Sequence, residues 1–353
     1  MKYNLFTLGE LATIKYGKNQ KKVQSEEGAV PIYGTGGLMG YATDALYDKP
    51  SVLIGRKGTI NKVRYVDHPF WTVDTLFYTV VNENLVIPKY LYYIMSLLDL
   101  DSYNEGTTIP SLRTETLNRL EFDIPNLDYQ EKVLSMLEPI ERKIKLNEDI
   151  NKNLEQQISA LYQSWFEDFD LTDRVCPESW GNQELSTIAD ISSGKRPSIK
   201  AESYSKETPI PIVGAASVMG FTSEANHTDK ILVTGRVGTH GIVQRFNTPC
   251  WTSDNTLVIK SSYYEFTNQI LKRIDYSSMN RGSTQPLITQ GDMKKVSVLV
   301  PDAETLTKFE AFAGTLMNQW EANKQENVKL ASLRDTLLPK LMSGVLDVSD
   351  IDL

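Results

Sequence analysis

The sequence of 353 residues has few of the side chains that build metal sites and disulfide frameworks. It holds two cysteines, Cys176 and Cys250, and three histidines that stand apart from the cysteines and from one another. Two cysteines make neither a disulfide framework nor a metal site, so we expect free thiols and a cytoplasmic location. No apolar run approaches membrane-spanning length, and the N-terminus has no signal-peptide core.

Motifs for nucleotide binding and catalysis are also missing. The glycine-rich segment IGRKGT lacks the spacing of a phosphate-binding loop, and no GxGxxG opens a helix. No Asn/Asp-Pro-Pro-aromatic tetrapeptide, which amino-methyltransferases use, occurs, and the carboxylates form no nuclease-like cluster. The sequence therefore predicts no catalytic residue, no metal site and no cofactor of its own.

Positive charge is scarce and unevenly placed. The net charge is −8, which excludes a globally basic nucleic-acid binder. Residues 1–127 hold 13 Lys+Arg and 14 Asp+Glu, and residues 171–301 hold 14 and 12. The remaining residues, in the two helical stretches and the tail, hold 10 Lys+Arg and 19 Asp+Glu. Such acidic helices suit protein partners better than DNA.

What the sequence does contain is an internal duplication at an offset of 176 to 180 residues. VPIYGTGGLMGY (30–41) returns as IPIVGAASVMGF (210–221), and IGRKGT (54–59) returns as TGRVGT (234–239). Such a full-length repeat predicts the order globular domain, helix, globular domain, helix.

Two stretches carry an apolar seam at alternating three- and four-residue spacing, which is typical of paired long helices. The seam is polar at Asn147 and Asn151 in the first stretch and at Asn323 and Asn327 in the second. An antiparallel pairing would place Asn147 opposite Asn327 and Asn151 opposite Asn323, and we expect these pairs to fix the helix register. The alternative is two separate amphipathic helices, each lying on its own domain.

The expected fold class is α+β, with two tandem mixed α/β domains joined by two long helices that form an antiparallel coiled coil with a pseudo-two-fold repeat. Short apolar runs between glycine-rich turns indicate the strands. The predicted segments are a first domain at 1–127, a helix at 128–170, a second domain at 171–301, a helix at 302–344 and an acidic tail at 345–353 that we expect to fray.

The loops of each half combine glycines, hydroxyls and cations, which can position a phosphate backbone. Positions shared by the halves are expected to build the fold or touch phosphates, and positions that differ could read bases. The alternative for each of these side chains is that it lies in a solvated loop and has no binding role. The candidate contact residues are Lys18, Tyr33, Thr35, Arg56, Lys57, Thr59, Lys195, Arg196, Arg236, Thr239 and His240.

This organisation resembles the specificity subunit of type I restriction-modification systems over essentially the whole chain. The resemblance rests on the repeated domain-then-helix order, on IGRKGT and TGRVGT, and on the strand-proline segments FDIPNLDYQEK and VLVPDAETLTK that precede the helices. Its most specific part is the closing LASLRDTLLPKLMSGVL. The family usually has a Glu-Gln pair where each helix begins, and this chain has Tyr129-Gln130-Glu131 and Glu304-Thr305-Leu306 instead.

The resemblance implies a non-catalytic DNA-binding subunit whose two target-recognition domains each read one half of a bipartite double-stranded DNA site. It implies as partners two methyltransferase subunits, which bring S-adenosylmethionine, and two restriction or motor subunits, which use ATP and Mg²⁺. It implies no cofactor on this chain and no membrane.

Two other functions compete with this one. A nucleotide-dependent transferase would need a motif that the sequence does not contain. A coiled-coil scaffold without DNA readout would tolerate the neutralisation of Lys57 and Arg236 without losing target methylation.

Overall fold

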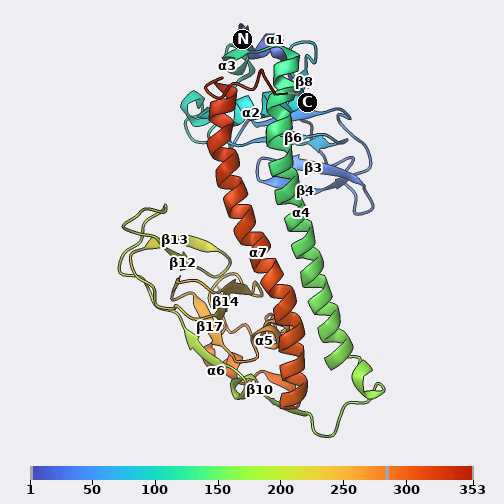
Figure 1. Ribbon diagram of the computed structural model, residues 1–353, viewed down its shortest axis with the longest axis vertical. Helices are drawn as coiled ribbons and strands as arrows, with labels where there is room; N and C mark the ends of the chain where they lie inside the picture. Colours follow the sequence, from blue (N-terminus) through green and yellow to red (C-terminus); the bar gives the residue numbers. More distant parts are fainter. Residues whose placement is uncertain (1–2, 283–285, 352–353) are drawn as a thin grey trace. The chain divides into compact units, whose positions relative to one another are not determined.

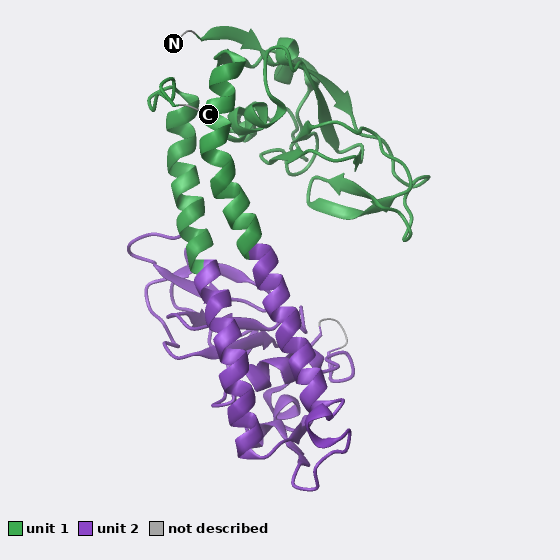
Figure 2. Cartoon of the chain, turned by 45° about the vertical axis from the view of Figure 1, so that its right-hand side comes forward, with its two compact units in different colours: residues 1–147, 325–353 green, residues 148–324 purple. Residues whose placement is uncertain are grey.

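The structure is a computed structural model that describes residues 3–282 and 286–351. It divides into two compact units, which Figure 2 shows in different colours. Unit 1 comprises Met1–Asn147 and Gln325–Leu353, and unit 2 comprises Glu148–Lys324. Each unit therefore combines a β-rich part with one portion of each long helix.

The β-rich part of unit 1 holds a four-stranded antiparallel sheet in the order β2-β8-β5-β6, a three-stranded sheet β4-β3-β7 and a two-stranded sheet β1-β9 (Figure 1). The strand β7 pairs with β3 in parallel, and the other pairs are antiparallel. The elements are β1 (Asn4–Thr7), α1 (Leu8–Leu11), β2 (Ala12–Tyr16), β3 (Val30–Gly34), β4 (Gly37–Ala42), β5 (Ser51–Gly55), β6 (Val63–Val66), β7 (Trp71–Thr72), β8 (Leu76–Val81), α2 (Pro88–Ser96), η1 (Leu100–Tyr103), α3 (Thr114–Asn118) and β9 (Glu121–Ile124).

Unit 2 repeats this plan with sheets in the orders β11-β17-β14-β15, β13-β12-β16 and β10-β18. Each strand occupies the place of its counterpart in the first half, and β12–β16 is the parallel pair. The elements are η2 (Asp170–Thr172), β10 (Gly181–Glu184), η3 (Leu185–Thr187), β11 (Asp190–Ser193), β12 (Ile210–Val213), β13 (Val218–Thr222), β14 (Ile231–Gly235), β15 (Gln244–Phe246), β16 (Trp251–Thr252), β17 (Thr256–Lys260), α5 (Tyr264–Arg273), α6 (Gln290–Lys294) and β18 (Ser297–Val300).

The two long helices are α4 (Leu127–Phe166) and α7 (Ala303–Met342), each of 40 residues. Within each unit they pack antiparallel. In unit 1, Asn147 Nδ2 donates to Asn327 Oδ1 (2.8 Å), and Asn327 Nδ2 donates to the Ile144 carbonyl (3.1 Å). In unit 2, Asn323 Nδ2 donates to Asn151 Oδ1 (2.8 Å). Because these hydrogen bonds form only in one alignment, each pair opposes a shift of one helix along the other.

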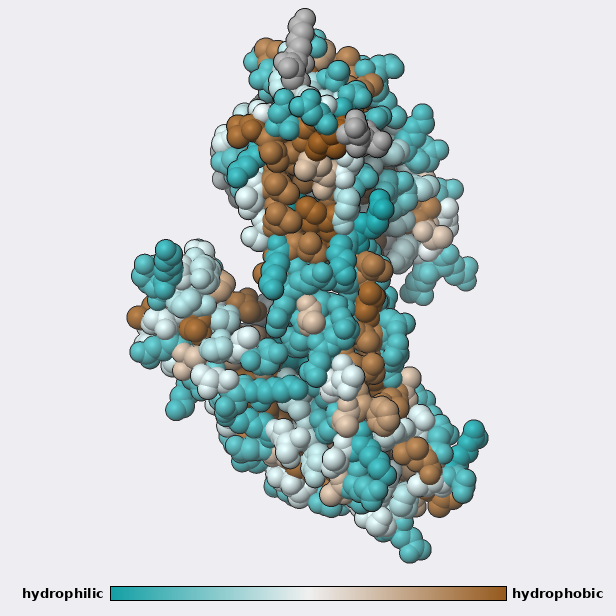
Figure 3. Space-filling model, in the orientation of Figure 1, coloured by the Kyte–Doolittle hydropathy of each residue, from teal (hydrophilic) through white to brown (hydrophobic). Residues whose placement is uncertain are grey.

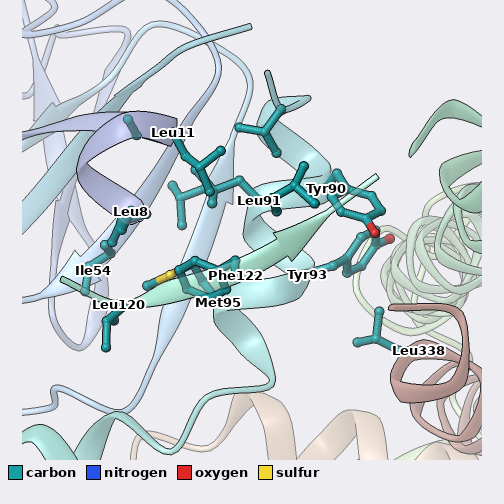
Figure 4. Packing of buried hydrophobic residues seen from close by; sticks show 14 of the residues in the cluster. Leu8, Leu11, Ile54, Tyr90, Leu91, Tyr93, Met95, Leu120, Phe122 and Leu338 are labelled. Carbon is teal, nitrogen blue, oxygen red and sulfur yellow. The ribbon is translucent and has the colours of Figure 1, made fainter. Parts of the chain in front are cut away.

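Each unit has its own principal core, to which the long helices contribute. In unit 1, Leu8, Leu11 and Ile54 lie in one buried cluster with side chains of α2 and with Leu338 of α7 (Figure 4). In unit 2, Phe309 of α7 packs edge-on against Trp165 of α4, with ring centroids 5.9 Å apart. The paired helices thus contribute one face to each hydrophobic core, and the expected α+β fold class is confirmed.

The C-terminal tail differs from expectation, because the described part of it does not fray. Helix α7 is followed by Gly344, whose φ of +71° is the left-handed conformation that glycine adopts without steric cost. Beyond it, Val348 is buried in the core of unit 1. Lys132 Nζ donates to the Ser349 carbonyl at 2.7 Å and ties this segment to α4. The acidic composition of the tail predicts solvent exposure, but three of its apolar side chains pack against the core of unit 1: Leu346, Val348 and Ile351.

Among the described residues, no helix is both long enough and apolar enough to cross a membrane.

Candidate nucleic-acid interface

In unit 1 the ends of three strands converge on the turn between β7 and β8. The Val73 backbone N–H donates to the Tyr33 carbonyl (3.0 Å) at the end of β3. A Cβ on Gly17, just after β2, would lie 2.0 Å from the Val73 carbonyl oxygen, so only glycine fits this approach. The Arg56 N–H, just after β5, donates to the Thr75 carbonyl (2.8 Å).

The loop after β5 is a compact turn closed by its own backbone. A Cβ on Gly55 would meet the Thr59 carbonyl oxygen at 2.2 Å, and Gly58 has a φ of +86°. The Gly58 N–H donates to the Pro110 carbonyl (2.9 Å), and Arg56 Nη1 donates to the Asp74 carbonyl (2.9 Å). These contacts explain why the glycines of IGRKGT recur, and they fix the backbone from which the Lys57 side chain projects.

Unit 2 builds the same arrangement from its own residues. The Ser253 N–H donates to the Val213 carbonyl (3.0 Å), and a Cβ on Gly194 would lie 2.1 Å from the Ser253 carbonyl oxygen. The Arg236 N–H donates to the Asn255 carbonyl (2.8 Å), and the φ of Gly238 is +83°. The chain therefore contains two copies of one loop cluster, each consisting of the ends of three strands around a turn.

The structure brings together most of the candidate residues of unit 1. A Cβ on Gly58 would be 3.8 Å from Thr35 Oγ1, which places the β3–β4 turn beside the loop of Arg56, Lys57 and Thr59. The Lys18 backbone joins the same cluster, because its carbonyl accepts a hydrogen bond from Trp71 Nε1 (2.8 Å). The side chains of Lys18, Lys57 and Thr59 are exposed.

Tyr33 differs from these exposed side chains because it is partly buried. Its hydroxyl lies 3.3 Å from Nε2 of His68. Burial raises the pKa of the Tyr33 phenol above its usual value, so the group keeps its proton at neutral pH. It can therefore donate or accept a hydrogen bond without carrying a negative charge.

In unit 2 the candidate side chains are arranged less uniformly. Lys195 and Arg196 are exposed, and the Lys195 carbonyl accepts a hydrogen bond from Trp251 Nε1 (2.7 Å). Thr239 is exposed, whereas Arg236 and His240 are partly buried. The His240 Nε2 lies 3.2 Å from the Arg236 carbonyl, so this ring nitrogen contacts its own loop.

Sequence reasoning missed further cations beside the cluster of unit 1. Arg113 and Arg119 line one cleft together with Arg56 and Lys57, and Glu105 lies among them. Arg113 Nε is 3.1 Å from the Glu105 carboxylate, which partly neutralises it. Arg113 and Arg119 lie more than 50 positions after the glycine loop. The bridge between Lys57 and Ser111 and the hydrogen bond from the Leu112 N–H to the Arg56 carbonyl (3.0 Å) bring the two segments together. No local signal in the sequence predicts that pairing.

The clusters offer exposed cations, hydroxyl groups and backbone. Within the described ranges, no three His, Cys, Asp or Glu side chains converge in a way that could hold a metal ion. Cations on loops held by a rigid sheet suit the binding of a polyanion.

Comparisons with known proteins agree with this interpretation. A family model described as the type I restriction modification DNA specificity domain matches residues 1–156 and 177–330. The two matched segments begin 176 residues apart, which is the offset of the internal repeat.

Two characterised relatives match most of the chain. The specificity subunit of the type I restriction enzyme MjaIX of Methanocaldococcus jannaschii is 25% identical, with 87% of this chain and 80% of that protein covered. The specificity subunit of the type I restriction enzyme HindI of Haemophilus influenzae is 22% identical, with 78% and 81% covered.

The fold also matches a solved structure. The crystal structure of the S subunit of a type I restriction-modification system from M. genitalium superimposes with a TM-score of 0.60 at 18% identity, covering 97% of this chain and 96% of that one. The family model spans most of the sequence in two copies, and the structure contains the loop cluster in two copies. The chain belongs to the specificity subunits of type I restriction-modification systems, the non-catalytic DNA-recognition part of these enzyme complexes.

Proposed function

We propose that this subunit recognises a bipartite DNA target, with residues 1–127 reading one half and residues 171–301 reading the other. The side chains that touch DNA are those of the two loop clusters: Lys18, Tyr33, Thr35, Arg56, Lys57 and Thr59 in the first, and Lys195, Arg196, Arg236, Thr239 and His240 in the second. The duplicated cluster is the observation that supports this proposal most strongly. Two copies of one backbone with different exposed side chains suit two different half-sites.

The helix pair is proposed to set the gap between the half-sites. Each helix has 40 residues. At about 1.5 Å per residue this gives a rod of about 60 Å, against about 34 Å for one turn of DNA. The asparagine pairs would then fix the gap length, because a shift of register would change it.

The proposed partners are two methyltransferase subunits and two restriction subunits, directed to the target by this chain in the cytoplasm. S-adenosylmethionine, ATP and Mg²⁺ belong to those partners in this scheme. Exposed apolar side chains on the long helices, which include Leu146 and Ile150 of α4, are compatible with docked subunits. Figure 3 shows apolar surface over the same helix.

The test is a map of methylated DNA. The chain is co-expressed with the methyltransferase encoded beside it in a host that lacks other DNA methylation, and the modified bases are located by sequencing. We expect a split motif, with two short specific halves around a fixed unspecified gap. A stable complex that methylates no motif would contradict the proposal and favour a scaffold.

A further inference from the structure

The β3–β4 hairpin of unit 1 and the β12–β13 hairpin of unit 2 share a feature at their tips that the loop clusters do not use. Each tip carries two adjacent apolar side chains that are exposed to solvent. The exposed fractions are 55% for Leu38, 54% for Met39, 44% for Val218 and 40% for Met219. An exposed apolar pair that recurs at one position of both repeats is a candidate binding surface.

A β-bulge positions the methionine in both hairpins. Ile32 pairs with Gly40 and Tyr33 with Leu38, so Met39 is the extra residue without a partner on β3. In unit 2, Ile212 pairs with Gly220 and Val213 with Val218, which leaves Met219 as the extra residue. Bulges redirect a side chain and concentrate near functional sites.

Glycines hold the bulged methionine in place. A Cβ on Gly34 would lie 2.3 Å from Met39 Sδ, and one on Gly214 would lie 3.1 Å from Met219 Sδ. The φ angles of Gly40 (+154°) and Gly220 (+150°), which follow the methionines, favour glycine as well. The backbone of each hairpin is thus shaped around its bulged methionine.

A cationic side chain lies beside each hairpin. Arg64 Nη2 is 3.3 Å from the position of a Cβ on Gly37, and Lys200 Cε is 3.1 Å from that of a Cβ on Gly220. No aspartate or glutamate occurs in residues 30–42 or 210–222, which form the hairpins. An apolar tip with a cationic side chain beside the hairpin and no acidic residue in its own strands is complementary to the major groove of DNA, which has anionic walls and the apolar C5-methyl groups of thymines.

We propose that each hairpin enters the major groove as a two-stranded ribbon and that Leu38–Met39 and Val218–Met219 contact the methyl groups of thymines. The inference rests on the proposed function, because it assigns new residues to the same DNA-binding surfaces. The major groove is wide enough for a two-stranded ribbon, and apolar side chains recognise thymine there through its C5-methyl group. A flexible methionine side chain adapts to that contact without a fixed hydrogen-bond geometry.

The test uses the complex of the full chain with its methyltransferase and the mapped target duplex. Dissociation constants are measured by fluorescence anisotropy for the target, for the target with uracil in place of thymine in one half-site, and for an unrelated duplex. The variants are Leu38→Ala with Met39→Ala, and Val218→Ala with Met219→Ala. Leu5→Ala is the control, because Leu5 is 61% exposed on β1, outside the hairpin.

We expect each double variant to bind the target about tenfold more weakly and the unrelated duplex as the parent does. Uracil in one half-site should weaken binding by the parent complex and by Leu5→Ala, but it should not further weaken binding by the double variant of the matching hairpin. The other half-site should keep its sensitivity. This pattern supports a thymine contact and assigns each hairpin to one half-site.

Several results would overturn the inference. One is that the double variants keep the parent's sensitivity to uracil. Another is that a half-site of the mapped target contains no A·T pair. A third is that a double variant weakens the assembly of the subunits rather than the discrimination between DNA sequences. The last result would assign the tips to a protein partner. A parent complex that does not distinguish the target from the unrelated duplex would instead remove the proposed function and this inference with it.

Discussion

The two units build one backbone with different side chains. The turn at 73–75 and its counterpart at 253–255 form equivalent hydrogen bonds with the ends of the neighbouring strands, donating from the first residue and accepting at the third. Beside these turns, however, Lys57 is replaced by Val237, and Tyr33 is replaced by Val213. The shared contacts are those that the fold requires. Of the exchanged side chains, Lys57 is exposed whereas Val213 is buried, so we propose that Lys57 rather than Val213 distinguishes the two units toward DNA.

The junction between each β-rich part and the long helices also differs. In unit 1 the buried amide of Gln130 accepts the Ile87 N–H (2.8 Å) just before α2. In unit 2 the carboxylate of Glu310 accepts the N–H groups of Glu265 (3.1 Å) and Phe266 (2.8 Å) at the start of α5. The same structural task is performed by a neutral group in one unit and by an acid in the other, so the units should respond differently to mutation and pH.

The largest difference is expected at the second residue of α2 and α5. In unit 2, Glu265 is 1% exposed and forms a bidentate pair with Arg245 at 2.6 and 2.7 Å. Arg245→Met should cost about 3–5 kcal/mol of stability, because it leaves Glu265 buried with Lys230 as its remaining cation.

Lys89 occupies the corresponding place in unit 1, and it serves as the control. Its pairs with Glu138 (3.5 Å) and Glu141 (3.0 Å) are partly exposed, so Lys89→Met should cost at most about 1 kcal/mol. Urea denaturation followed by tryptophan fluorescence and by circular dichroism measures both variants. Equal losses would show that burial of the pair does not distinguish the units.

The next largest difference between the units is expected in the pH dependence of their stability. Burial raises the pKa of Glu310 to about 6 from an ordinary 4.5. A carboxyl with a raised pKa in the folded state stabilises the fold below pH 4.5, and this contribution is lost as the pH rises through about 6. The loss amounts to about 2 kcal/mol.

Glu310→Gln removes this titration, so its melting temperature should fall less than that of the parent between pH 4.5 and 7. Glu304→Gln, an exposed change on the same helix, should follow the parent. A parallel pH profile for the parent and Glu310→Gln would contradict the assignment.

A smaller effect is expected in the helix pair. Asn151→Leu together with Asn323→Leu should raise stability by roughly 1 kcal/mol, because both partners of a buried hydrogen bond become apolar. The register should loosen at the same time, or the oligomeric state should change. Denaturation, small-angle scattering and the gap length of the methylated motif are the measurements. A monomer of unchanged shape with an unaltered gap would argue against the role of the asparagines in fixing the register.

The smallest effect is expected when the charged and uncharged side chains at one position of the two loop clusters are exchanged. Lys57→Val makes the first loop resemble the second, and Val237→Lys does the reverse. If Lys57 contacts a phosphate, the slope of log K against log salt should fall by about 1 in the first variant and rise by about 1 in the second. If both variants show the same salt dependence of binding as the parent, Lys57 does not contact a phosphate and lies in a solvated loop.

The sequence predicts the long-range plan better than it predicts the sites. A seam of apolar residues and two asparagine pairs at one offset are sufficient to expect the helix pair. The strands at 51–55 and 76–81 follow from short apolar runs between turns. The α+β fold class and the family follow from the duplication of these patterns and are confirmed.

What the sequence does not predict depends on contacts between distant segments. The parallel pairing of β3 with the two-residue strand β7 leaves no periodic pattern, yet it creates the turn on which each cluster is built. The β5–β6 register brings Arg64 to the site, and the backbone contacts of residues 56–58 with residues 110–112 bring Arg113 there. The burial of Val348 could not be predicted, because its neighbours in the sequence are acidic and indicate an exposed tail.

The most direct test of the central claim is an exchange of residues 171–301 for the corresponding domain of a family member with a different target. The methylated motif of the chimaera is then mapped by sequencing. If each β-rich part reads one half-site and the helix pair sets the gap, one half of the motif should change while the other half and the gap stay the same. A motif that changes in both halves, or in the gap alone, would contradict the account.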